Sequence, residues 1–131
     1  MSMPIALVID DNSVLRQFIR FTLESKGWMV AEAQDPHEGL EVFRQVRPQL
    51  ITLDLIMPIN KGLDAVQLAR QIHDEDPEVT VLVVSGIAPT QDVKDLFARR
   101  GLEVFDKPSG DKPTFDKLFA RIDTVFRELS H

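Results

Sequence analysis

The amino-acid sequence predicts an α/β fold, a doubly wound parallel sheet of five strands with five helices. Short apolar runs rich in β-branched residues alternate along the chain with stretches in which apolar residues recur every three or four positions. No long insertion interrupts this alternation. Successive strands are therefore expected to be parallel and to be joined by right-handed helical crossovers that cover both faces of the sheet.

Five segments are expected to form the strands. In chain order they are residues 5–9, 29–33, 50–53, 79–84 and 102–105, the last with the weakest pattern. A short, continuous apolar run is typical of a strand that is buried on both faces. Ligands of such sheets bind at the carboxyl ends of the strands, so chemically active residues are expected there.

Amphipathic helices fill the intervals between the strands. The apolar positions of the first three helices are Val14, Leu15, Phe18 and Ile19; Leu40, Val42, Phe43 and Val46; and Leu63, Val66, Ala69 and Ile72. Asp35, followed by Pro36 and Glu38, predicts the N-cap of the second helix. Gly27 and Gly101 follow helical stretches, at places where a left-handed residue commonly ends a helix.

A last amphipathic helix is expected after Pro113. Its apolar face would consist of Phe115, Leu118, Phe119, Ile122, Val125, Phe126 and Leu129. This helix completes the fold, and 131 residues suit one domain with a core large enough to fold unaided. We therefore expect a single domain over residues 1–131, with no effector domain within it, either as a stand-alone protein or as part of a longer one.

Composition narrows the classes of function. The 21 acidic and 15 basic residues give a net charge of −6, which disfavours direct binding to nucleic acid or anionic lipid. Cysteine is absent, and His37, His73 and His131 are too scattered for a local zinc motif. The sequence has neither a signal peptide nor an apolar stretch of roughly 20 residues. We expect a cytoplasmic protein without a nucleic-acid or membrane partner.

Polar residues follow four of the five predicted strands. Asp10 and Asp11 come after the first strand, Asp54 after the third, Ser85 after the fourth and Lys107 after the fifth. Each alone has an ordinary explanation as a turn former, a helix cap or a solvated side chain. Their joint placement has none, because clustered carboxylates raise one another's pKa unless a cation neutralises them.

The chemistry of this cluster favours a divalent metal. Oxygen ligation by carboxylates, water and a phosphate group suits Mg²⁺ better than a softer metal. A carboxylate beside such a metal can attack phosphorus, while Lys107 and Ser85 help to stabilise the oxygens of the transferred group. The predicted product is an aspartyl phosphate.

Four motifs carry a resemblance to a known family. They are Val-Ile-Asp-Asp-Asn at residues 8–12, Asp-Leu-Ile-Met-Pro-Ile-Asn-Lys-Gly at 54–62, Val-Val-Ser-Gly at 83–86 and Lys-Pro at 107–108. In the order and spacing of these motifs, nearly the whole chain resembles the receiver domains of two-component response regulators, including the chemotaxis regulator. The resemblance implies a flavodoxin-like strand order, 2-1-3-4-5.

The resemblance also implies roles for the residues at the strand ends. Asp54 would be the phosphoacceptor, Ser85 would hydrogen-bond the phosphoryl group and Lys107 would pair with it. Mg²⁺ would be held, directly or through water, by Asp10, Asp11, Asp54 and the backbone carbonyl of Ile56. The domain would not be an enzyme beyond catalysing its own phosphorylation and dephosphorylation. The Lys107–Pro108 peptide would be cis.

Expected partners follow from the same resemblance. The donor would be a phosphohistidine on a sensor histidine kinase or histidine phosphotransfer protein, docked beside the first helix, where Val14, Leu15 and Phe18 are candidate contacts. The helical pattern places at least one of these three in the core instead. The output surface would comprise residues 91–100, 102–105 and 114–130. It would control a downstream target protein, an output domain or a phosphorylation-dependent dimer.

Two positions depart from the family pattern. Many receivers have an aromatic residue three positions before the lysine, and here that position is Val104. Phe105 follows it and would take the aromatic role only through a shifted backbone. A phenylalanine often follows the Lys-Pro pair, whereas this chain has Ser109. The coupling from Ser85 to the output surface is therefore left open.

Three other functions share parts of this pattern. A phosphohydrolase of the haloacid dehalogenase kind needs two aspartates spaced Asp-x-Asp after the first strand, but Asp10 and Asp11 are adjacent. A flavodoxin-like electron carrier needs a phosphate-cradling loop there, and these acids would repel the phosphate. The remaining alternative is a receiver fold that acts as an interaction module without phosphorylation, although such a module has no physical need for clustered carboxylates.

Overall fold

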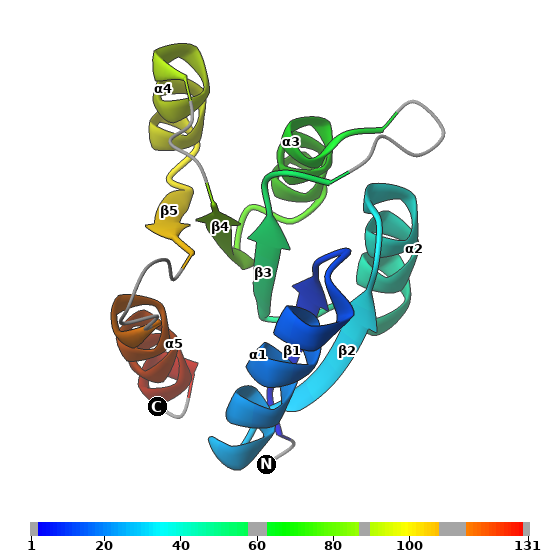
Figure 1. The fold of residues 1–131 in the computed structure, drawn as a ribbon, viewed down its shortest axis with the longest axis vertical. Coiled ribbons are helices and arrows are strands. Elements are labelled where there is room, and N and C mark those ends of the chain that lie inside the picture. Colours follow the sequence, from blue (N-terminus) through cyan, green and yellow to red (C-terminus); the bar gives the residue numbers. More distant parts are fainter. Residues whose placement is uncertain (1–2, 58–62, 87–89, 108–114, 130–131) are drawn as a thin grey trace.

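The computed structural model describes residues 3–57, 63–86, 90–107 and 115–129. The strands are β1 (Ile5–Ile9), β2 (Met29–Ala33), β3 (Leu50–Asp54), β4 (Thr80–Ser85) and β5 (Glu103–Asp106). The helices are α1 (Ser13–Ser25), α2 (Pro36–Val46), α3 (Ala65–Glu75), α4 (Gln91–Arg99) and α5 (Asp116–Leu129). All strand pairs are parallel, in the order β2-β1-β3-β4-β5, which confirms the predicted fold class and strand order (Figure 1).

Two apolar cores hold the sheet, one on each face, because successive side chains of a strand point to opposite sides. The first core joins the sheet to α2, α3 and α4 and includes Ile9, Phe43, Leu53, Leu68, Ile72 and Phe97. The second core joins the sheet to α1 and α5 and includes Val8, Ile19, Leu23, Trp28, Leu118 and Ile122. The central strands are thus packed from both sides, which holds their carboxyl ends in place.

The strand boundaries follow the apolar pattern only in part. β1 and β2 have the predicted bounds, whereas the other three strands end one residue later than their apolar runs. Asp54 pairs with Val84 in the ladder, and Ser85 pairs with Asp106. Backbone hydrogen bonding does not depend on side-chain polarity, so these polar residues extend the strands.

The helix ends agree with the predicted capping residues. The Asp35 side chain accepts a hydrogen bond from the backbone N–H of Glu38 at 2.8 Å and caps α2. Gly27 and Gly101 have φ angles of 101° and 70°, which confirms the left-handed residues expected after α1 and α4. The apolar face of α5 is shorter than predicted, because Leu129 at its end is 43% exposed.

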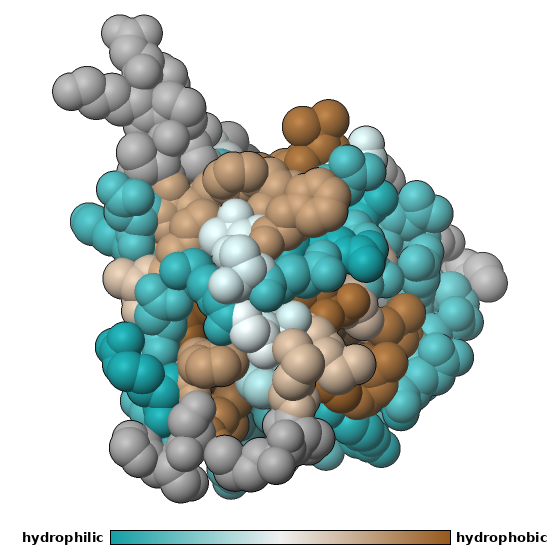
Figure 2. Space-filling view, turned by 90° about the horizontal axis from the view of Figure 1, so that it is seen from below, coloured by the Kyte–Doolittle hydropathy of each residue, from teal (hydrophilic) through white to brown (hydrophobic). Residues whose placement is uncertain are grey.

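Some large apolar side chains stay exposed: Met3, Val14, Phe18, Phe21, Met29, Ile56 and Leu129. Three of them lie on α1, at positions that form one stripe along its outer side. Seen from below, apolar patches are interleaved with hydrophilic side chains (Figure 2). Within the described residues, no helix is long and apolar enough to cross a membrane.

Gly27 and Gly101 provide a matched test of backbone strain. A Cβ atom at Gly27 would lie 3.0 Å from Cζ of Phe126, whereas a Cβ at Gly101 would have no neighbour within 4 Å. We predict that Gly101→Ala lowers the free energy of unfolding by about 1 kcal/mol, through left-handed strain alone. Gly27→Ala should cost about 2–3 kcal/mol, because the ring must also move. Urea denaturation measures both costs, and equal values would contradict a steric role for Phe126.

Candidate functional site

The polar residues singled out in the sequence meet at one edge of the sheet. Asp10 follows β1, Asp54 ends β3, Ser85 ends β4 and Lys107 follows β5. The strands are adjacent and in register, since Asp54 pairs with Val84 and the backbone N–H of Lys107 donates to the Ser85 carbonyl at 2.8 Å. Parallel pairing therefore brings together residues that are far apart in the sequence.

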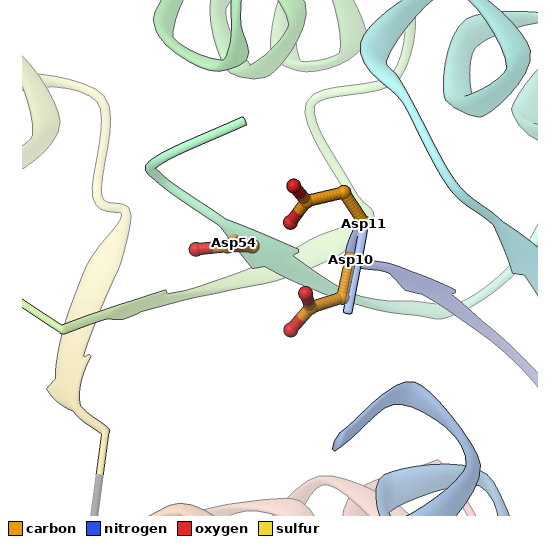
Figure 3. Close-up of side chains that lie close together, drawn as sticks. All are labelled: Asp10, Asp11 and Asp54. Carbon is orange, nitrogen blue, oxygen red and sulfur yellow. The ribbon is translucent and has the colours of Figure 1, made fainter. Parts of the chain in front are cut away.

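Three carboxylates form the centre of this edge. Each of Asp10, Asp11 and Asp54 offers an oxygen, and these oxygens all lie within 4.8 Å of one another. Asp10 and Asp54 are buried, with 2% of each residue exposed, whereas Asp11 is exposed. The three side chains extend to the same side of the strand ends (Figure 3). A ligand that approaches from solvent would therefore meet the exposed Asp11 before the two buried acids.

Lys107 supplies the positive charge of the cluster. Its Nζ lies 3.0 Å from Oδ1 of Asp54 and 3.8 Å from Oδ2 of Asp10. The backbone N–H of Ile56 also donates to Oδ1 of Asp54, at 3.2 Å. The other oxygen, Oδ2, is buried and accepts no hydrogen bond from a donor among the described residues. The two oxygens of Asp54 thus differ: Oδ1 is held by two donors, whereas Oδ2 is buried without a hydrogen bond from the described residues.

The charge balance of the cluster is unfavourable without a further cation. Burial raises the pKa of Asp54 from 3.8 to about 6; the charge of Asp10 adds to this effect, and Lys107 opposes it. Burial also raises the pKa of Asp10, against the hydrogen bond from the Asn12 N–H and the charge of Lys107. A divalent cation would relieve the excess negative charge, so the donor set fits the predicted Mg²⁺.

The loop that carries Asp10 and Asp11 is tied to the start of α1. Oδ1 of Asp10 accepts a hydrogen bond from the backbone N–H of Asn12 at 2.9 Å. The Asn12 side chain caps α1 by accepting from the N–H groups of Val14 and Leu15. Asn12 therefore joins the acidic loop, residues 10–12, directly to the first turn of the helix.

The family of this chain follows from its similarity to known proteins. The family model of the response regulator receiver domain matches residues 6–121. The chain belongs to the family of response-regulator receiver domains. Such domains are modules of two-component signalling systems, so the resemblance predicted from the four motifs is confirmed.

Individual relatives agree with this receiver-domain identity. The chain is 38% identical over 127 residues to the transcriptional regulatory protein CseB of Streptomyces avermitilis, a match that covers 95% of this chain and 50% of that protein. This receiver domain thus spans about half the length of that curated relative.

Solved structures share the fold. A CheY-like receiver domain protein from Methanospirillum hungatei JF-1 has a TM-score of 0.82 at 21% identity, covering 97% of this chain and 96% of that chain. The response regulator TrrA from Thermotoga maritima, in complex with Mg²⁺-BeF, has a TM-score of 0.77 at 23% identity, covering 94% of this chain and 99% of that chain.

The two residues considered for the aromatic role lie on opposite faces of the sheet of this receiver domain. Val104 packs against the core that contains Phe97 of α4, whereas Phe105 packs against the core shared by α1 and α5. Consecutive strand residues alternate in direction, so Phe105 faces away from α4. The aromatic side chain buried between α4 and the sheet is Phe97.

The remaining predicted residues divide into three groups. On α1, Val14 and Phe18 are 77% and 51% exposed, whereas Leu15 packs against the core, as expected for at least one of the three. Ile56 has a half-exposed side chain beside the cluster, and the role of its backbone carbonyl stays a prediction. The expected cis peptide between Lys107 and Pro108 lies outside the described residues, as does Ser109.

Arg16 is a residue near the site that the sequence patterns did not single out. Its side chain donates a hydrogen bond to the backbone carbonyl of Asp10.

The raised pKa of Asp54 predicts a pH-dependent stability. A carboxyl group whose pKa is about 6 in the folded chain and 3.8 in the unfolded chain holds its proton more tightly when folded. The free energy of unfolding therefore falls as pH rises through this window, by about 1–3 kcal/mol in total. Without Mg²⁺, Asp54→Asn should stabilise the fold by a similar amount at about pH 8, and by much less at about pH 4.

Thermal unfolding at the two pH values measures this effect. Asp74→Asn is the matched control, because the hydrogen bond from Arg100 lowers the pKa of Asp74 and its substitution should not stabilise the fold. Equal stability of wild type and Asp54→Asn at the higher pH would contradict the prediction.

Proposed function

We propose that this receiver domain accepts a phosphoryl group on Asp54, in the presence of Mg²⁺, and thereby controls a partner protein or an output domain. The observation that carries the proposal is the state of Asp54. Its carboxylate is buried, Oδ1 is held by Lys107 and the Ile56 N–H, and Oδ2 accepts no hydrogen bond from a donor among the described residues. A fixed carboxylate with one oxygen that no hydrogen bond engages is suited to attack on phosphorus.

The metal would be held by the carboxylates of Asp10, Asp11 and Asp54, with the Ile56 carbonyl as a further ligand. When bound, Mg²⁺ would neutralise the carboxylates and draw negative charge from the phosphoryl oxygens. The grouping of the three acids within 4.8 Å supports this assignment, as does the burial that raises the pKa of Asp54 and Asp10. The Mg²⁺-BeF complex of TrrA concerns a protein of the same fold and supports the choice of metal.

The reaction would join Oδ2 of Asp54 to phosphorus as the bond between phosphorus and the donor histidine nitrogen breaks. The electron pair of that bond returns to the imidazole ring, which leaves as neutral imidazole because its other nitrogen carries a proton in the donor. Lys107 would move from the carboxylate toward the phosphoryl oxygens, and the Ser85 hydroxyl would donate a hydrogen bond to one of them. The domain acts on its own aspartate only, so it is a signalling module and not an enzyme for other substrates.

The outer side of α1 is the proposed docking surface for the phosphohistidine protein. Val14 and Phe18 are exposed, and Phe21 is 65% exposed one turn further along the helix. The Phe18 ring stacks on Phe115 with a centroid distance of 6.1 Å, which fixes the orientation of the exposed ring. An apolar stripe on a helix next to the acidic edge fits a helical partner that must bring its histidine to Asp54.

Output would pass through α4, β5 and α5. In longer relatives such as CseB, the length beyond the receiver match leaves room for an output domain, which supports control of such a domain or of a separate target. Dimerisation on phosphorylation is a further form that this output could take. The single unit over residues 1–131 and the cytoplasmic location stay predictions.

The central test is phosphorylation by a small acyl phosphate. With Mg²⁺, intact-mass analysis should show the mass of one added phosphoryl group on the wild type. Asp54→Asn, and wild type in a chelator, should show none. Size-exclusion chromatography of the same samples shows whether the phosphorylated form dimerises. Absence of added mass on the wild type would favour the interaction module that acts without phosphorylation.

The docking surface is tested by comparing protein and small-molecule donors. Phe18→Ala should slow phosphotransfer from a histidine phosphotransfer protein by about tenfold, because a buried aromatic contact contributes about 1–2 kcal/mol to an interface. Phosphorylation by an acyl phosphate should be unchanged. Met29→Ala is the control. Met29 is equally exposed, but it is the first residue of β2 and so lies at the amino end of that strand, whereas the acidic cluster lies at the carboxyl ends. Equal transfer rates for Phe18→Ala and wild type would remove α1 as the docking helix.

A further inference from the structure

Arg16 of α1 holds the acidic loop from the side opposite Lys107. Its Nη1 donates to the backbone carbonyl of Asp10 at 2.7 Å, and its Nε donates to Oε1 of Glu32 on β2 at 3.0 Å. The Arg16 side chain is only 16% exposed. The backbone N–H of Asp10 is held too, by the carbonyl of Ala33 at 3.1 Å. The main chain of Asp10 is thus fixed at both its N–H and its carbonyl group.

The carbonyl that Arg16 binds belongs to the peptide unit that joins Asp10 to Asp11. This unit is planar, so its orientation determines how the Cα atoms on both sides present their side chains. These side chains are two of the three carboxylates that group within 4.8 Å. Guanidinium donors have a rigid planar arrangement, which lets one side chain bridge a carbonyl and a carboxylate with little freedom.

The neighbouring Arg20 provides a natural comparison. Its Nη1 pairs with the other oxygen of Glu32, and its Nε pairs with Glu24 at 2.8 Å. Arg20 therefore shares the Glu32 partner and the helix with Arg16, but its described hydrogen bonds do not include the acidic loop. The contact that distinguishes the two arginines is the bond to the Asp10 carbonyl.

We propose that Arg16 is a positioning residue, which orients the Asp10–Asp11 peptide so that both carboxylates face the metal. The proposal rests on the proposed function for the identity of the metal. Arg16 itself does not touch the metal or the phosphoryl group. Groups that orient metal ligands commonly contribute about ten- to a hundredfold to metal affinity.

Two measurements test this role on the full chain. In metal-free protein, Arg16→Met should speed hydrogen exchange of the Asp11 and Asn12 amides by about tenfold, because the loop loses its anchor. In calorimetric titration with Mg²⁺ alone, Arg16→Met should weaken binding by about tenfold. Arg16→Lys keeps the charge but lacks the rigid planar set of Nε and Nη donors, so it should fall between Arg16→Met and wild type.

Arg20→Met is the matched control and should bind Mg²⁺ within about twofold of the wild type. Equal affinity for Arg16→Met and wild type would overturn the proposal, as would an equal loss in Arg20→Met. Thermal unfolding identifies a variant that fails to fold. If Arg16→Met does not fold, Arg16→Lys becomes the test: amide exchange and Mg²⁺ affinity equal to those of the wild type would then overturn the proposal. A wild type that binds no Mg²⁺ would contradict the proposed function. The effect of Arg16 on the loop would then be judged from amide exchange in the metal-free protein, where equal rates in Arg16→Met and wild type would overturn the proposal.

Discussion

The site depends on one electrostatic constraint, the confinement of two buried carboxylates beside the ammonium of Lys107. Asp54 and Asp10 lie at the strand ends with almost no exposure, and Lys107 contacts both. Burial raises the pKa of each acid, so the arrangement costs free energy at neutral pH. The two apolar cores offset this cost, because they pack the sheet from both faces and prevent the strand ends from moving apart.

The same constraint links the site to its surroundings. The three carboxylates outnumber the ammonium of Lys107, so a bound cation or phosphoryl group, as proposed, would change the forces on Lys107 and on the loop after β1. That loop continues into α1 through the Asn12 cap, and its backbone is held by Arg16. Asp54 is therefore connected with α1 through a chain of contacts by way of Lys107, Asp10 and Asn12.

On the other side of the site, the route toward α4 differs from the usual receiver pattern. Val104 occupies the position three residues before the lysine, and the large side chain between α4 and the sheet is Phe97 from the helix. Phe105 lies in the opposite core and supports the contact with α5. On this side of the sheet, β5 thus contributes an aliphatic side chain and α4 an aromatic one to the same core.

From the sequence alone one could predict the fold class, the strand bounds to within one residue, and the grouping of Asp10, Asp11, Asp54, Ser85 and Lys107. These features follow from local patterns, namely apolar period, capping residues and the position of polar residues after each strand. The third helix was placed less well, since Leu63 lies before the start of α3. The different surroundings of the two Asp54 oxygens, and the exposure of individual α1 residues, became visible in the three-dimensional structure and could not be predicted from the sequence. The tertiary structure also decided on which face Phe105 lies and that Arg16 reaches the Asp10 carbonyl. These properties depend on distances between separate elements, and such distances arise from packing, which no local pattern in the sequence contains.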